Sequence, residues 1–100
     1  MIRGSTPKYT FRTKISTTLI KSLSIAYAQN GSLVLRKTKG DCSFSENAIS
    51  VELTQEETLR FSGFSTVEIQ LKALDQTNKL IISEIYVVPC KRVLDEEVLV

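Results

Sequence analysis

The chain has 100 residues, 42% of them hydrophobic, with 13 basic and 11 acidic side chains and a formal net charge of +2. These values are typical of one globular domain, and no apolar run approaches the ~20 residues that cross a bilayer. Histidine is absent and there are only two cysteines, so we expect a non-enzymatic protein with no metal, cofactor, membrane contact or small-molecule substrate.

Residues 1–7 are predicted to form a flexible lead-in that ends at Pro7. From residue 8 the side chains alternate, with Tyr9, Phe11 and Ile15 on one side and basic residues on the other. This period of two predicts a first strand with a basic outer face. The polar residues that follow, up to Lys21, are predicted to form a turn or a short bend.

A second apolar alternation, from Leu23 to Tyr27, predicts the next strand. Asn30 and Gly31 follow it, and both residue types tolerate the positive φ that a type I′ turn requires. A third strand is predicted from residue 33 to about residue 38. The two strands are therefore expected to pair as a hairpin.

After a turn, residues 42–44 are predicted to form a short edge strand, and residues 49–53 alternate as another strand. Thr54 and Glu57 have the spacing of a capping box, which predicts a single helical turn that crosses from one sheet to the other. Three apolar residues beyond this turn are expected to close the end of the core: Leu59, Phe61 and Phe64.

Residues 67–74 alternate strictly and predict a strand, and residues 75–79 have the length of a hairpin loop. Residues 80–88 predict one long last strand, which ends before Pro89 because proline donates no hydrogen bond. Its inward set is predicted to be Ile81, Ile85 and Val87. The opposite face is also apolar, so we expect a cover on both faces, either the tail or another protein: Leu80, Ile82, Tyr86 and Val88.

About seven short strands separated by turn signals predict an all-β protein, an immunoglobulin-like antiparallel β-sandwich over residues 8–90 with a tail at 91–100. Tryptophan is absent, which disfavours an antibody-type domain because those domains pack a central Trp on a disulfide. Cys42 and Cys90 are expected to be reduced thiols, as in the cytosol. The sequence leaves open whether they pair.

The charges are divided unevenly along the chain. Residues 1–40 carry eight basic side chains and no acidic one, whereas residues 41–100 carry five basic and eleven acidic ones, so the two parts have net charges of +8 and −6. Such a division is typical of a basic arm for nucleic acid, or of two parts that attract each other within one molecule or between neighbours. Binding of nucleic acid is disfavoured because Tyr9 and Phe11 lie on the side of the strand opposite its basic side chains, so they cannot stack on nucleobases beside them.

No residues have the arrangement of a catalytic site. Ser62 precedes a glycine but has no neighbouring base, and the four glycines are isolated, so no phosphate-binding loop is present. The acidic pairs in the turn at Glu56 and Glu57 and in the tail at residues 95–97 are predicted to be solvated charges.

Six segments carry a resemblance across nearly the whole chain: 2–7, 25–30, 41–42, 49–59, 67–71 and 93–99. In their order and spacing the chain resembles short proteins encoded among the structural genes of Gram-positive tailed phages and prophages. The resemblance implies a virion or virion-assembly protein that is made in the cytoplasm of the bacterial host. It supplies no functional residues.

We therefore expect a structural or accessory component of a phage capsid, tail or baseplate that binds other virion proteins or copies of itself. The alternative is a small phage-encoded inhibitor of a host enzyme or defence complex. Nine residues are predicted to form the protein interface: Arg3, Lys8, Arg12, Lys14, Ile82, Tyr86, Val88, Leu94 and Leu99.

Overall fold

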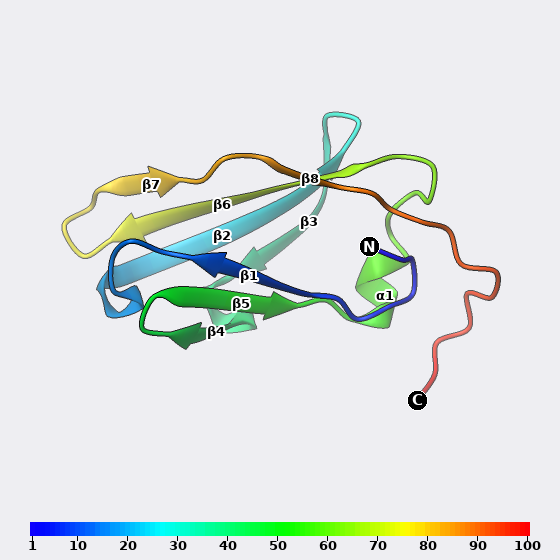
Figure 1. The fold of residues 1–100 in the computed structure, drawn as a ribbon, viewed down its shortest axis with the longest axis horizontal. Coiled ribbons are helices and arrows are strands. Elements are labelled where there is room, and N and C mark those ends of the chain that lie inside the picture. The colour runs from blue at the N-terminus through cyan, green and yellow to red at the C-terminus, as the bar shows by residue number, and fades with distance from the viewer.

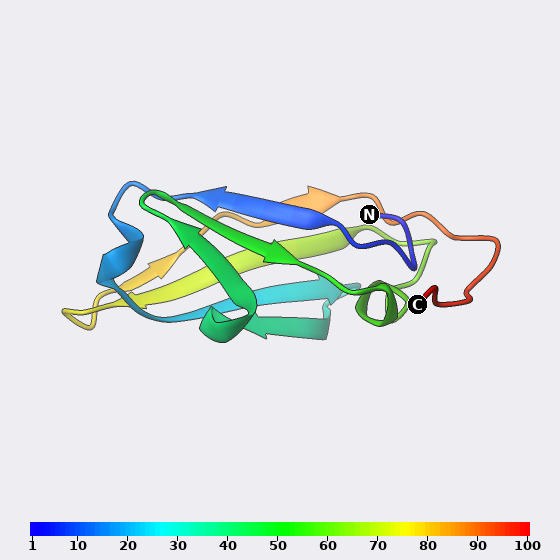
Figure 2. The same cartoon turned by 90° about the horizontal axis from the view of Figure 1, so that it is seen from below.

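Two antiparallel sheets pack face to face in the computed structural model, which describes residues 1–100 (Figures 1 and 2). The small sheet has the order β1-β5-β4, with β1 at Lys8–Arg12, β5 at Ala48–Glu52 and β4 at Cys42–Ser45. The large sheet has the order β3-β2-β6, followed at its edge by β7 and β8, which both pair with β6. Its strands are β2 (Ile20–Gln29), β3 (Ser32–Thr38), β6 (Val67–Asp75), β7 (Leu80–Ile82) and β8 (Tyr86–Val88).

This strand order confirms the predicted immunoglobulin-like sandwich. The small sheet corresponds to strands B, E and D of that fold, and the large sheet corresponds to strands C′, C, F and G. No strand occupies the position of strand A beside β1. Three short helical turns complete the fold: η1 (Thr17–Leu19), η2 (Lys39–Asp41) and α1 (Gln55–Thr58). None of the helices is long and apolar enough to cross a membrane.

Two local predictions are confirmed at the turns. Asn30 and Gly31 have φ values of 51° and 79°, as a type I′ hairpin between β2 and β3 requires. At α1 the Thr54 hydroxyl accepts from the Glu57 N–H at 3.2 Å, and the Glu57 carboxylate accepts from the Thr54 N–H at 2.9 Å. Both signals act between residues close in sequence, so the local pattern was sufficient to find them.

The Glu57 carboxylate also joins α1 to the hairpin. Lys37, on the inner face of β3, is only 8% exposed, and its Nζ lies 2.6 Å from Glu57 Oε2. Burial alone would raise the pKa of Glu57, but the hydrogen bonds from Lys37 and Thr54 outweigh it, and the pKa lies below its ordinary value. The pair therefore keeps a charge on each partner inside the protein.

Three aromatic rings fill the centre of the core. The Tyr27 ring lies 5.8 Å from the Tyr9 ring and 6.2 Å from the Phe61 ring, measured between centroids. Tyr27 is fully buried and its hydroxyl has no hydrogen-bond partner. Cys42 and Cys90 are both free thiols, so no disulfide joins the sheets.

The end of the core is closed differently from the prediction. Phe61 is buried as expected, and Leu59 is half-buried, but Phe64 is 86% exposed. The buried Gln29 amide holds the loop instead, since it donates to the Ser62 carbonyl at 2.9 Å and accepts from the Ser62 N–H at 2.8 Å. These two bonds hold the loop against β2 and turn Phe64 toward solvent.

The prediction of one long last strand is wrong, because a β-bulge divides it into β7 and β8. Ile81 lies opposite Ala73 and Tyr86 lies opposite Ile69, so the edge carries one residue more than β6 over this interval. Ser83 sits at the bulge, where its hydroxyl accepts from the Leu71 N–H at 2.9 Å. An extra residue exchanges the two faces of everything beyond it.

The predicted inward set is therefore wrong after Ile81. Ile85 and Val87 are 54% and 60% exposed, whereas Tyr86 and Val88 lie on the side of the core. The tail does not cover the second face, since Ile82 is 55% exposed, and the alternative of a cover by another protein stays a prediction. The tail lies at the opposite end of the molecule from β7 (Figure 1).

The first residues, predicted to be a flexible lead-in, are hydrogen-bonded to the start of the tail. Ile2 pairs in parallel with Lys91, and the Arg3 N–H donates to the Lys91 carbonyl at 2.9 Å. Gly63 lies so close to Arg92 that a Cβ at this glycine would be 2.7 Å from the Arg92 Cα. The tail therefore begins in a fixed position between these two segments.

We predict that Glu57→Gln lowers the free energy of unfolding by about 2 kcal/mol at pH 7, because it leaves the Lys37 charge buried without its partner. Glutamine keeps the shape of the capping box. The pKa of Glu57 is lowered in the folded state, so its stabilisation is present above the unfolded pKa and is lost as pH falls through the folded one. Urea unfolding from pH 7 to pH 3 should show the difference from the wild type shrinking, with exposed Glu56→Gln as the matched control.

Tyr27→Phe should raise the free energy of unfolding by about 1 kcal/mol, because it removes a buried hydroxyl that has no partner and keeps the ring contacts. Urea unfolding measures the change. A loss of stability in this variant would show that the hydroxyl is bonded in solution.

Candidate functional site

A groove runs between the free edges of the two sheets. β1 borders the small sheet and β7–β8 borders the large one, and residues of both edges line the same two hollows. Met1 and Arg3 bond to the chain beyond β8, where the Met1 amino group donates to the Pro89 carbonyl at 2.8 Å. These first residues therefore occupy one end of the groove and leave the rest of the groove unoccupied.

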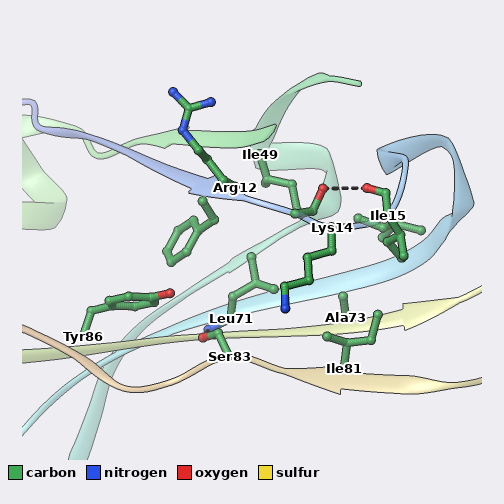
Figure 3. A pocket seen from close by; sticks show the side chains of 12 residues that line it. Arg12, Lys14, Ile15, Ile49, Leu71, Ala73, Ile81, Ser83 and Tyr86 are labelled. Carbon is green, nitrogen blue, oxygen red and sulfur yellow. Dashed lines mark hydrogen bonds between the residues drawn. The ribbon is translucent and has the colours of Figure 1, made fainter. Parts of the chain in front are cut away.

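The first hollow, which we call the Ile81 hollow, has a volume of about 280 Å³ (Figure 3). Its walls are mainly apolar, with Ile49 on the side of the small sheet and Leu71, Ala73 and Ile81 on the side of the large one. Leu71 and Ala73 alternate inward on β6, and Ile81 stands opposite Ala73. An apolar hollow of this size can accept an apolar side chain of a bound segment.

The second hollow, which we call the Val88 hollow, has a volume of about 270 Å³. Tyr9 and Phe11 of β1 face Ile69 of β6 and Val88 of β8 across it. The rings of Phe11 and Tyr86 meet edge to face, with centroids 5.8 Å apart. This ring contact separates the two hollows, since both residues line both of them.

Two basic residues border the groove: Arg12 at the end of β1, and Lys14 two residues after it. Lys14 extends across the Ile81 hollow toward Leu71 and Ser83, whereas the Arg12 guanidinium points away from it (Figure 3). Neither forms an ion pair, since the structure holds only the pairs of Arg3 with Glu96 and of Lys37 with Glu57. The groove therefore presents an apolar floor under a positive charge that has no partner within the chain.

The backbone of β1 has unused hydrogen-bonding groups along the groove. The Leu53 N–H donates to the Pro7 carbonyl and the Thr13 N–H donates to the Asn47 carbonyl, so the odd-numbered residues of this segment face β5. In an antiparallel ladder the alternate residues then face away from the partner. Lys8, Thr10 and Arg12 accordingly direct their N–H and C=O groups to the free edge.

The structure brings together only part of the predicted interface. Four of its residues line the groove: Arg12, Lys14, Tyr86 and Val88. Lys8 lies on the same strand, and Ile82 pairs with Lys72 on the outer face of the large sheet. Tyr86 and Val88 were expected on that outer face, and the bulge at Ser83 is the reason that they lie on the groove side.

Three predicted interface residues lie at the other end of the molecule. The Arg3 guanidinium is engaged within the chain, where it donates to the Phe61 and Leu59 carbonyls at 2.7 and 3.0 Å and pairs with Glu96. Leu94 and Leu99 belong to the tail and are 95% and 73% exposed. The Arg3 guanidinium is therefore engaged within the chain and is not free for a partner.

Sequence reasoning missed Phe11, Ile81 and Ala73 as groove residues, because they have the alternation of ordinary core positions. The polar Ser83 inside an apolar strand was the one signal of a bulge.

The two cysteine thiols lie in surroundings that disfavour the reactive thiolate. Burial raises the pKa of both the Cys42 and the Cys90 thiols, which keeps them protonated near neutral pH. No group of three or more His, Cys, Asp or Glu side chains is placed to hold a metal ion. The groove itself combines apolar walls, a basic side chain and an open strand edge.

No protein-family model matches the chain, and no curated protein matches it. Among solved structures, the chain is similar to the immunoglobulin-like domain of mouse leukocyte-associated immunoglobulin-like receptor 1, which was solved as a strand-swapped dimer. The two share 9% identity over 93% of this chain and 84% of that one, with a TM-score of 0.49. Likeness at this level supports no inference about partners, and the assignment of the fold stands on the strand order.

Tyr86→Ala should join the two hollows and increase the fluorescence of a dye that binds apolar surface, at a cost of about 1–2 kcal/mol in the free energy of unfolding. Val87→Ala, on the opposite face of the same strand, is the matched control and should leave dye binding unchanged. Equal dye binding by the two variants would contradict the position assigned to the groove.

Proposed function

We propose that this chain is a non-enzymatic component of a tailed-phage virion that binds a neighbouring subunit through the groove between β1 and β7–β8. The observation that carries the proposal is the unpaired edge of β1 beside two apolar hollows. An extended segment of a partner that pairs with such an edge gains backbone hydrogen bonds, and its alternate side chains enter the hollows. The virion as the setting comes from the sequence resemblance.

A protein partner fits the groove better than nucleic acid does. Binding of single strands uses exposed aromatic rings on which bases stack. Here Tyr9 and Phe11 are half-buried against the core, and the Phe11 ring contacts Tyr86. The basic side chains of β1 can instead meet the acidic part of a neighbouring protein, which is an arrangement that sets the register and speeds association.

Thr10→Pro tests the use of the edge, because it removes an N–H that faces the groove and none that faces β5. We expect particles made with this variant to contain the protein at a level at least about tenfold lower, as the loss of one edge bond and the crowding by the ring imply. Quantitative mass spectrometry of purified virions measures it. Thr10→Val keeps the N–H and should be incorporated normally.

The melting temperatures of both variants must stay near that of the wild type for the comparison to hold. Absence of the wild-type protein from particles, despite its synthesis during infection, would overturn the proposal and favour the alternative of an inhibitor. Normal incorporation of Thr10→Pro would show that the edge of β1 is not the contact.

A further inference from the structure

We infer that the segment that fills the groove is residues 92–100 of the tail of a second copy of this chain, added as a strand beside β1. This inference rests on the proposed function of the groove and names the occupant. The small sheet has only three strands and lacks one beside β1, at the place of strand A in the immunoglobulin-like order. A fourth strand would satisfy the free backbone groups of Lys8, Thr10 and Arg12.

The tail has the exposure expected of a segment that binds elsewhere. Leu94 is 95% exposed, which leaves a large apolar side chain in water, and Val98 is half-buried in a hollow that Gln55 and Glu56 also line. Few contacts hold this segment to its own domain. The Arg3–Glu96 pair is partly exposed, and the Gln55 amide makes two bonds to the backbone of Leu99, at 2.8 and 3.0 Å. Glu96 is the exposed partner of that pair, and the Arg3 guanidinium keeps its bonds to the Phe61 and Leu59 carbonyls when Glu96 leaves, so release of the tail costs little stability.

The spacing of the tail matches the spacing of the hollows. Ile69 lines the Val88 hollow and Ala73 lines the Ile81 hollow, four residues further along β6. Leu94 and Val98 are also four residues apart, and in a strand they lie on the same face. Each of these apolar side chains can therefore enter one hollow, with Glu96 between them on the same face.

The positive charge of Lys14 in the groove is complementary to the carboxylate of Glu96 in the added strand. Lys14 extends across the Ile81 hollow over an apolar floor, and it has no acidic partner in its own chain (Figure 3). Asp95 and Glu97 fall on the opposite face of the added strand, which is the solvent side. The division of the chain into a basic first part and an acidic last part thereby acquires a specific contact, Glu96 of one copy with Lys14 of the next.

A second copy fits this contact better than the chain's own tail. The tail leaves the domain beside α1 and the N-terminus, whereas the Ile81 hollow lies toward the other end, near β7 (Figure 1). The pairing of Ile2 with Lys91 fixes the start of the tail at its own end. A contact from the tail of one copy to the groove of the next is heterologous, so it closes into a ring or extends as a filament.

A charge exchange in the full-length chain tests the contact by sedimentation velocity at low salt over a range of concentrations. The wild type should self-associate, and association should weaken as salt is added. Lys14→Glu alone and Glu96→Lys alone should each weaken association by about tenfold or more. The double variant carrying both substitutions should restore it, because the two charges again have opposite signs.

Two matched controls separate this contact from a general effect of charge. Lys72→Glu changes a base on the outer face of the large sheet, and Glu97→Lys changes an acid on the other face of the tail. Both should leave association close to that of the wild type. All four positions are exposed in the structure, so each variant is expected to fold, and thermal unfolding verifies it.

A wild type that stays monomeric, or single variants that associate normally, would overturn the inference. So would a double variant as weak as the single ones. Incorporation into particles is a separate readout. If incorporation depends on Thr10 while the charge exchange fails, the groove binds another virion protein and the proposed function stands without the tail. If the chain is absent from particles but the exchange rescues self-association, the contact between tail and groove stands without the virion.

Discussion

The register between β6 and the edge strands β7 and β8 determines which side chains line the groove and which face solvent. Side chains of a strand alternate between two faces, so one additional residue at Ser83 transfers every later side chain to the other face. Tyr86 and Val88 thereby line the groove, and Ile85 and Val87 are turned to solvent. The same bulge interrupts the edge of the large sheet and leaves the regular edge of β1 as the better partner for an added strand.

The parts of the fold that follow from local signals could be predicted from the sequence. The Asn30-Gly31 turn, the capping box of Thr54 and Glu57, and the alternation of β6 each depend on residues close together in the chain. The bulge could not be predicted in the same way, because it depends on the bonds of Ser83 to Leu71 across the sheet. Phe64 was misplaced for a similar reason, since the side chain of Gln29 holds the loop from another strand. The groove itself depends on how the edges of two sheets are placed side by side, which alternation along one strand does not specify.

The sandwich is held together without a covalent bond between its sheets. The rings of Tyr9, Tyr27 and Phe61 pack against one another in the core, and no disulfide joins the sheets. The Lys37–Glu57 pair adds a polar connection between β3 and the crossing turn α1. A core of this kind depends on the packing of side chains rather than on a disulfide bond.

Gly63 affects the direction in which the tail leaves the domain. The loop that contains it approaches the backbone of Arg92 so closely that any side chain at residue 63 would displace the start of the tail. The direction in which the last residues leave the domain is therefore set by the lack of one methyl group. In an array joined through those residues, the angle between successive copies, and with it the curvature of a ring or the pitch of a tube, would be inherited from this single position.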